Sequence, residues 1–219
     1  MEQKKKERNF CKGCGNYIQF GESKEYCIFC QSEDFLKTLE DKPLKTLEDK
    51  KFMFKILLIG ENKVGRSTLL KDLNVLYKDR MITLGVDFYL KELRIKEKRV
   101  VLRIWNVSTN KAFRHLLHSF IKGSNGVLLM FDITNLDTLM FLSNFPQLLR
   151  EHAGVIPILL VGNKIDKENE REVSKEAGIT FAKNNELIGF IEISAKKGQN
   201  CENVFEILTK NLINLLGRS

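Results

Sequence analysis

Residues 53–67 read MFKILLIGENKVGRS, a run from Met53 to Ile59 that is apolar except for Lys55, followed by a loop with glycine at positions 60 and 65. The loop from Gly60 to Ser67 fits the phosphate-binding pattern GxxxxGK[ST] except at Arg66, which stands where the pattern has lysine. Such glycines let backbone N–H groups wrap a phosphate, and the serine hydroxyl is placed to reach Mg²⁺. A guanidinium is bulkier than an ammonium, so Arg66 should fit poorly between two phosphates. The alternative is an ordinary glycine turn.

Five further apolar runs follow the first, with helix-period stretches between most of them. The expected strands are 53–59, 87–96, 99–105, 126–132, 156–162 and 188–193, and the expected helices are 67–77, 111–121, 138–152, 174–184 and 202–216. This alternation predicts an α/β fold with a mainly parallel six-stranded sheet, whose ligands bind beyond the carboxyl ends of the strands. Only residues 96–98 join the second and third strands, which predicts an antiparallel hairpin at the edge of the sheet.

Two more loops at strand ends carry polar motifs, Asn163-Lys164-Ile165-Asp166 and Ser194-Ala195-Lys196. With the three loops in this order, residues 52–219 resemble the Ras superfamily of small GTPases, and the Rab-like branch most closely. The resemblance implies a Ras-like P-loop G domain, with helices on both faces of the sheet, that binds GTP or GDP and Mg²⁺. The implied nucleotide-binding residues are Gly60, Lys63, Gly65, Arg66, Ser67, Thr68, Thr83, Asn163, Lys164, Asp166, Ser194, Ala195 and Lys196, and the implied magnesium ligands are Ser67 and Thr83.

Asp166 accounts for the choice of base. Its carboxylate can accept hydrogen bonds from N1–H and N2–H₂ of guanine, donors that adenine lacks at the matching edge. The resemblance implies that Asn163 and Lys164 pack the base and join the loops, and that the Ala195 N–H meets guanine O6. Tyr77 is a candidate for stacking on the base, and packing on the core is the alternative.

Two segments resemble the switches that sense the γ-phosphate in this superfamily. Residues 81–88, MITLGVDF, resemble the first switch, with Thr83 placed to bind Mg²⁺ through its hydroxyl. Gly85 allows a close backbone approach. The alternative is a threonine and a glycine at the entrance of a strand.

The second switch departs from the pattern of the superfamily. Rab-like proteins have a WDTAGQE-type run, and this chain has WNVSTNK at 105–111. Asn106 replaces the acid that orients a Mg²⁺-bound water, and Thr109 replaces the glycine whose N–H reaches the γ-phosphate. Asn110 replaces the glutamine that positions the attacking water, so it is the degenerate catalytic residue. The sequence therefore predicts weak or absent GTP hydrolysis.

Residues 1–33 carry four of the five cysteines, Cys11, Cys14, Cys27 and Cys30. Two CxxC pairs suit a closed tetrahedral Zn²⁺ site, and they predict a small zinc ribbon whose folding depends on the metal. A rubredoxin-like iron site and no metal are the alternatives. Residues 34–51 contain LKTLEDK twice, at 36–42 and 44–50, which indicates a charged linker.

Composition limits the classes of partner. The chain has 219 residues and a formal net charge of +8, from 36 basic and 28 acidic residues. The charge is spread along the chain, so nucleic-acid binding is not favoured. His115 and His118 lie one helical turn apart, which favours a solvated helix face over a metal site. Cys201 is expected to be a small residue at the start of a helix rather than a nucleophile.

The N-terminus has no apolar stretch behind its charges, no glycine follows Met1, and the last residues contain no cysteine. These features predict a cytoplasmic protein without a membrane span or a lipidation site. The expected function is guanine nucleotide binding with protein effectors or regulators. Two alternatives remain, a pseudo-GTPase scaffold that binds no nucleotide and a zinc-ribbon adaptor that binds nucleic acid.

Overall fold

The computed structural model describes residues 52–71, 75–81, 85–109 and 117–216. The predicted zinc module at 1–33 and the duplicated linker at 34–51 lie outside these residues. In chain order, the elements are β1 (Phe52–Gly60), α2 (Arg66–Lys71), β2 (Val75–Met81), β3 (Val86–Ile95), β4 (Lys98–Val107), α3 (Leu117–Ile121), β5 (Gly126–Asp132), α4 (Leu136–Met140), α5 (Phe145–Ala153), β6 (Ile158–Asn163), the 3₁₀ helix η3 (Ile165–Glu170), α6 (Lys175–Asn184), β7 (Gly189–Ile193) and α7 (Cys201–Leu216).

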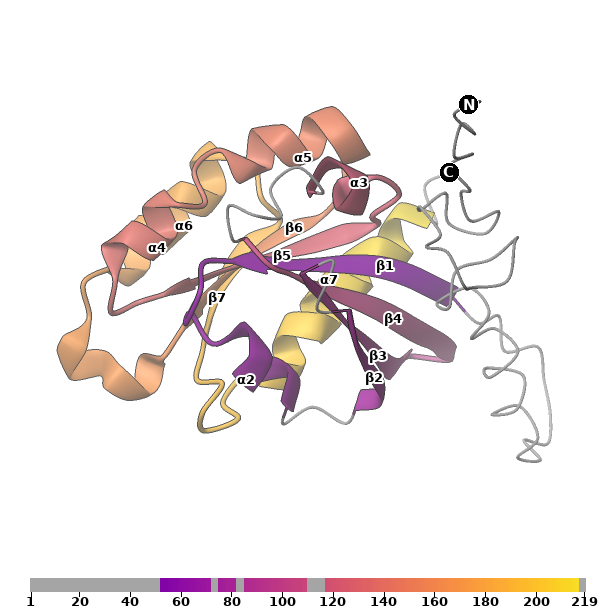
Figure 1. Ribbon diagram of the computed structural model, residues 1–219, viewed down its shortest axis with the longest axis horizontal. Coiled ribbons are helices and arrows are strands. Elements are labelled where there is room, and N and C mark those ends of the chain that lie inside the picture. Colours follow the sequence, from indigo (N-terminus) through magenta and orange to yellow (C-terminus); the bar gives the residue numbers. More distant parts are fainter. Residues whose placement is uncertain (1–51, 72–74, 82–84, 110–116, 217–219) are drawn as a thin grey trace, which may run out of the picture. The chain divides into compact units, whose positions relative to one another are not determined.

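The strands of the described residues form one mixed sheet in the order β2-β3-β4-β1-β5-β6-β7. β1 pairs in parallel with β4 and β5, and β6 and β7 extend the parallel half. Figure 1 shows α3, α4, α5 and α6 along one side of the sheet and α2 and α7 along the other. The α/β fold and the six predicted strands are confirmed. Because β1, β6 and β7 run parallel, the loops after them share one edge of the sheet.

β2 adds a seventh strand where the sequence predicts a helix from Ser67 to Tyr77. That prediction is wrong, because α2 ends at Lys71 and β2 begins at Val75, which places Tyr77 in a strand. β2 pairs antiparallel with β3, so β2 lies at the sheet edge that was predicted for the hairpin of β3 and β4. A short apolar run is compatible with a helix or a strand, and in residues 75–81 pairing with β3 determines the strand.

The helix predicted over 138–152 is two helices, α4 and α5, with turns between them. Pro146 lies in the first turn of α5, where its missing N–H costs nothing, whereas it would interrupt one continuous helix. The predicted helices at 174–184 and 202–216 agree with α6 and α7 within a residue at each end. No helix of the described residues is long and apolar enough to cross a membrane.

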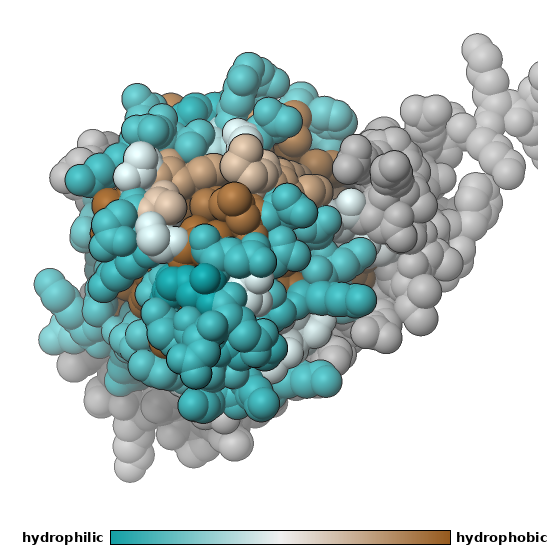
Figure 2. Space-filling model, turned by 90° about the vertical axis from the view of Figure 1, so that its left-hand side faces the viewer, coloured by the Kyte–Doolittle hydropathy of each residue, from teal (hydrophilic) through white to brown (hydrophobic). Residues whose placement is uncertain are grey.

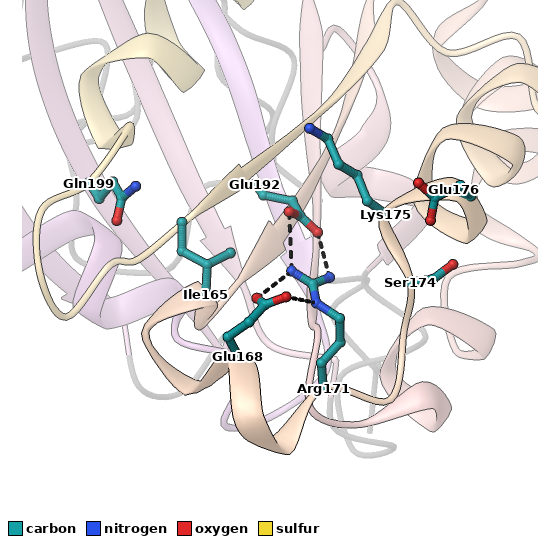
Figure 3. Close-up of a pocket in the computed structure, with 8 residues that line it drawn as sticks. All are labelled: Ile165, Glu168, Arg171, Ser174, Lys175, Glu176, Glu192 and Gln199. Atoms are coloured by element: carbon teal, nitrogen blue, oxygen red, sulfur yellow. Dashed lines mark hydrogen bonds and ion pairs between the residues drawn. The ribbon is translucent and has the colours of Figure 1, made fainter.

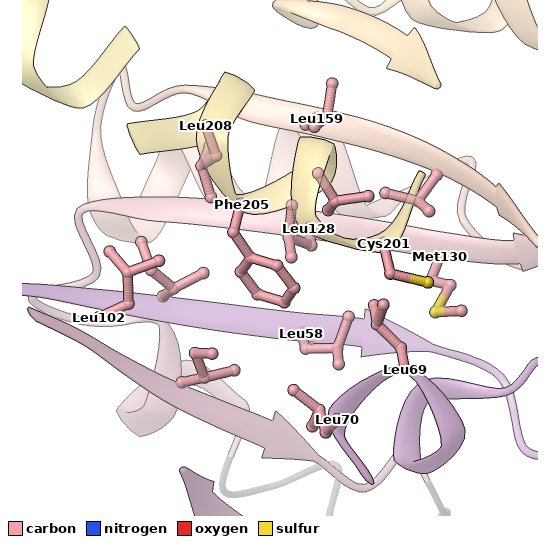
Figure 4. Close-up of a cluster of buried hydrophobic side chains, with 14 of the residues drawn as sticks. Leu58, Leu69, Leu70, Leu102, Leu128, Met130, Leu159, Cys201, Phe205 and Leu208 are labelled. Carbon is pink, nitrogen blue, oxygen red and sulfur yellow. The ribbon is translucent and has the colours of Figure 1, made fainter. Parts of the chain in front are cut away.

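A hydrophobic core fills the space between α7, α2 and the sheet (Figure 4). Phe205, Leu208 and Leu212 share one face of α7 and are buried, as their helical spacing predicts. Leu215 lies one turn further along α7 and is 47% exposed. Cys201 is buried at the first position of α7, which confirms its packing role.

Candidate nucleotide site

The loop between β1 and α2 depends on two glycines. A Cβ on Gly60 would lie 2.3 Å from the carbonyl oxygen of Met130, and a Cβ on Gly65 would lie 2.2 Å from Nδ2 of Asn163. Gly65 also has a φ of 100°, a conformation that favours glycine. A larger residue at either position would therefore displace the loop.

Three predicted nucleotide-binding residues are exposed on this loop and on the first turn of α2. They are Lys63, Ser67 and Thr68. Lys63 is itself left-handed, with a φ of 69°, so the loop turns sharply at this residue. The ammonium group and the two hydroxyls are accessible to a ligand.

Asn163 joins three loops through one buried side chain. It ends β6 and is 2% exposed. Its Nδ2 donates to the carbonyl oxygen of Val64 at 2.7 Å, and its Oδ1 accepts from the N–H of Ala195 at 2.9 Å. The phosphate-type loop after β1 and the loop after β7 are thus held to the loop after β6.

The resemblance directs the Ala195 N–H to guanine O6, and in the structure this N–H has a partner within the protein. The structure gives this donor to Oδ1 of Asn163, since a buried amide oxygen needs a donor of its own. Ala195 is 1% exposed. This hydrogen bond connects the loops after β6 and β7.

Lys164 follows Asn163 in a left-handed conformation, with a φ of 75°. Its Nζ forms an ion pair with Oδ2 of Asp132, at the end of β5. Oδ1 of Asp132 accepts from the N–H and the hydroxyl of Thr134 at 3.0 and 2.8 Å. This ion pair fixes the aliphatic stem of Lys164 between the loops after β5 and β6, and the sequence does not indicate Asp132 as its partner.

Asp166 and Ser194 bring the second and third loops together. The hydroxyl of Ser194 donates to Oδ1 of Asp166 at 2.5 Å and accepts from the N–H of Lys197 at 3.1 Å. The hydrogen bond from Ser194 lowers the pKa of Asp166, and the positive charges of Lys196 and Lys197 lower it further. Asp166 therefore stays ionised at neutral pH, as an acceptor for the N–H donors of a base.

Arg66 is turned toward the end of β4. Its Nη1 donates to Oδ1 of Asn106 at 2.9 Å and to the carbonyl oxygen of Val107. Nδ2 of Asn106 donates in turn to Oδ2 of Asp87 at 3.4 Å. Burial lowers the pKa of Arg66 to about 10, and the nearby charge of Asp87 partly opposes that shift. Sequence reasoning identified Arg66 and Asn106 separately and missed their contact.

Thr109 links the second switch to the phosphate-type loop. Its hydroxyl donates to the carbonyl oxygen of Gly60 at 3.0 Å. Beside it, the N–H of Ser108 donates to the carbonyl oxygen of Gly85 at 2.7 Å, and Gly85 has a φ of 65°. The side chain that replaces the expected glycine thus has a partner of its own.

The described donors do not fit a magnesium ion. Ser67 offers a hydroxyl, but position 106 is an amide whose oxygen faces the cation of Arg66. Mg²⁺ takes oxygen ligands and is usually bound through one or two carboxylates. Within the described ranges, no cluster of three or more His, Cys, Asp or Glu suits a metal.

Several predicted site residues lie outside the described residues. They are the magnesium ligand Thr83, the degenerate catalytic residue Asn110, His115 and the zinc ligands Cys11, Cys14, Cys27 and Cys30. Lys196, the last residue of the third motif, is exposed beside Ala195.

A charged network supports the loop that carries Asp166. Arg171 donates to Glu168 and to Glu192, at 2.7 Å in each case, and these hydrogen bonds raise the pKa of Arg171. Figure 3 shows the three side chains together at an open cavity of about 470 Å³. Glu192 belongs to β7, so the network fixes the end of η3 against the sheet. The spacing of Glu168 and Arg171 is a signal for their pairing, but the sequence contains none for Glu192.

Comparison with known proteins places the sequence of this chain in a family. A family model described as the Ras family matches residues 55–214. Among curated proteins of Arabidopsis thaliana, Ras-related protein RABC1 is 40% identical over 167 residues, 74% of this chain and 78% of the relative. Ras-related protein RABC2b is 37% identical over 165 residues, covering 73% and 80%, and Ras-related protein RABC2a is 38% identical over 170 residues, covering 73% and 78%.

Proposed function

Since the chain belongs to the Ras family, whose GTPases bind GTP or GDP and Mg²⁺, we propose that it binds guanine nucleotides at the loops after β1, β6 and β7. The observation that carries the proposal is the side chain of Asn163, which joins these loops through bonds of 2.7 and 2.9 Å. A ligand with a base at one end and phosphates at the other can contact all three loops when they are held together in this way.

Different loops of the described residues bind the base and the phosphates. Asp166 accepts hydrogen bonds from N1–H and N2–H₂ of guanine, and the hydroxyl of Ser194 fixes the orientation of the carboxylate. Lys63, Ser67 and Thr68 donate to the phosphates from the loop after β1. The glycines at 60 and 65 keep that loop's backbone on its path.

Analysis of the nucleotide in freshly purified protein tests the proposal. Denaturation followed by chromatography is expected to release GDP or GTP and no adenine nucleotide. Comparable affinity for ATP and GTP in a direct titration would contradict the proposal.

We further propose that intrinsic hydrolysis is slower than the rate of Ras alone, which is on the order of 10⁻⁴ s⁻¹. Thr109 is β-branched and bonded to Gly60, so its backbone lacks the freedom of the glycine found in Rab-like proteins. Asn110 is one methylene shorter than the glutamine that positions water.

The substitutions Thr109→Gly and Asn110→Gln, made together, are expected to raise the rate of single-turnover GTP hydrolysis. The glycine restores backbone freedom near the γ-phosphate, and the glutamine restores reach toward the attacking water. Rapid mixing and phosphate release measure the rate. If the wild-type protein hydrolyses GTP as fast as the double variant, the claim of a weakened site is wrong.

We also propose that residues 1–33 bind zinc through Cys11, Cys14, Cys27 and Cys30. Elemental analysis of protein purified without chelator is expected to detect zinc at about one ion per chain, the stoichiometry of a four-cysteine site. Cys11→Ser or Cys30→Ser should abolish the metal and leave the G domain folded, because it has its own core. Cys201→Ser is the matched control, and it should retain the zinc. Metal-free wild-type protein would contradict the proposal.

A second candidate function is a scaffold that binds no nucleotide. The contact of Arg66 with Asn106 favours it, because that contact occupies one nitrogen of Arg66, a residue expected to bind the phosphates. Figure 2 shows a hydrophobic area within a mainly hydrophilic face, the kind of surface that a protein effector or regulator contacts. The nucleotide analysis above separates this candidate from the first.

A further inference from the structure

Three side chains form a hydrogen-bonded chain beside the phosphate-type loop. Nη1 of Arg66 donates to Oδ1 of Asn106 at 2.9 Å, and Nδ2 of Asn106 donates to Oδ2 of Asp87 at 3.4 Å. Asn106 is 7% exposed. Both polar ends of its amide are therefore occupied, and the amide oxygen, which would otherwise be free to accept from a metal-bound water, faces a cation.

Arg66 brings a positive charge, and its direct hydrogen-bond partners carry no charge; the carboxylate of Asp87 lies beyond Asn106. The two oxygens contacted by its Nη1, on Asn106 and Val107, are neutral carbonyl oxygens. The guanidinium of arginine carries its charge at neutral pH. Nε and Nη2 carry three more N–H groups, which are suitable donors for phosphate oxygens.

We infer that Arg66, rather than Mg²⁺, is the cation that neutralises the phosphates, so that this chain binds guanine nucleotide equally well with and without Mg²⁺. The inference rests on the proposed guanine nucleotide binding. A guanidinium pairs with phosphate oxygens in a bidentate manner, which a compact ammonium does not do.

The same arrangement disfavours Mg²⁺ in two ways. The guanidinium is held against the side chain of Asn106, so its charge repels a divalent cation at that position. The amide at position 106 also contributes no negative charge to the surroundings of a metal, and loss of an outer-shell partner typically lowers metal affinity by about 10- to 100-fold. Together, these effects leave Arg66 as the dominant positive charge.

The test measures the affinity of a fluorescent GDP analogue for the full chain in metal-depleted buffer, with and without added Mg²⁺. No chelator is used, because it would also remove zinc from the N-terminal cysteines. The wild-type affinities are expected to agree within about threefold, a small difference in binding free energy. The double variant Arg66→Lys with Asn106→Asp is expected to lose about 10- to 100-fold in affinity when Mg²⁺ is left out.

Two further variants keep the test decisive. Arg66→Gln removes the charge, and it is expected to weaken binding about tenfold or more without Mg²⁺, as loss of a charged hydrogen bond does. Arg150→Gln is the matched control, since Arg150 also donates to a backbone carbonyl, that of Asn185, but lies on α5 outside the nucleotide loops. Arg150→Gln should leave the affinity for the GDP analogue unchanged both with and without Mg²⁺.

Each outcome has one meaning. A wild-type affinity that rises about tenfold or more with Mg²⁺ overturns the inference and leaves guanine nucleotide binding standing. Unchanged binding by Arg66→Gln overturns the inference as well. Absence of binding by the wild type in both buffers overturns the proposed function together with the inference.

Discussion

Asp166→Asn is expected to weaken GDP binding by roughly 10²- to 10⁴-fold and to make xanthosine diphosphate the better ligand. The loss corresponds to two hydrogen bonds to a charged acceptor, each worth about 1.5–3 kcal/mol. The asparagine amide replaces one acceptor with a donor, which opposes the amino group of guanine and suits the carbonyl of xanthine at the same position. The hydroxyl of Ser194, 2.5 Å from Oδ1, can hold the new side chain in the same orientation.

Titrations with GDP, xanthosine diphosphate and ADP measure this change. Glu170→Gln is the matched control, because it removes one negative charge from the same 3₁₀ helix, where Glu170 pairs with Lys167 in solvent. Its GDP affinity should equal that of the wild type. Retained guanine preference in Asp166→Asn would show that this carboxylate does not read the base.

Asn163→Ala is expected to lower the free energy of unfolding by about 2–6 kcal/mol and to weaken GDP binding as well. The substitution leaves the carbonyl oxygen of Val64 and the N–H of Ala195 without their partner, and each buried unsatisfied group costs about 1–3 kcal/mol. Val64 is 0% and Ala195 1% exposed, so water cannot readily replace the lost bonds. The loops for the base and the phosphates would then no longer be held together.

Urea unfolding followed by circular dichroism measures the loss of stability. Asn211→Ala is the matched control, because its Nδ2 also donates to a backbone carbonyl, that of Ile207 at 2.9 Å, but within α7 and at a half-buried position. Its effect should stay near about 0.5 kcal/mol, because water reaches a half-buried carbonyl oxygen and replaces the lost bond. If Asn163→Ala costs no more than this control, Asn163 does not hold the loops together.

The sequence predicts the fold well where burial decides the structure. The parallel strands β1, β5 and β6 are buried along most of their length, so each reads as a mainly apolar run, interrupted in β1 by Lys55. Prediction from the sequence fails where strand pairing or a single residue determines the secondary structure. β2 forms a strand because it pairs with β3. The break before α5 lies next to Pro146, and the apolar residues around Pro146 keep a helical spacing that does not indicate the break.

The candidate site shows a similar division. Motif spacing places Asn163, Asp166 and Ser194 at one edge of the sheet, because they follow neighbouring parallel strands. The contact of Arg66 with Asn106 joins residues 40 positions apart, and no periodic pattern indicates it. The same holds for His118, whose Nδ1 lies 2.8 Å from Nε2 of His152 on another helix. Contacts of this kind depend on the packing of whole elements.

The close approach of Gly65 to Asn163 makes these two positions interdependent in mutation. A Cβ at position 65 would lie 2.2 Å from Nδ2 of Asn163, so any substitution there displaces the side chain that joins Val64 to Ala195. A smaller residue at position 163 would relieve the clash but not the φ of 100° at Gly65. The two substitutions are therefore non-additive. A side chain at position 65 and a smaller residue at position 163 therefore act on the same contacts, because each disturbs the hydrogen bonds that join Val64 to Ala195.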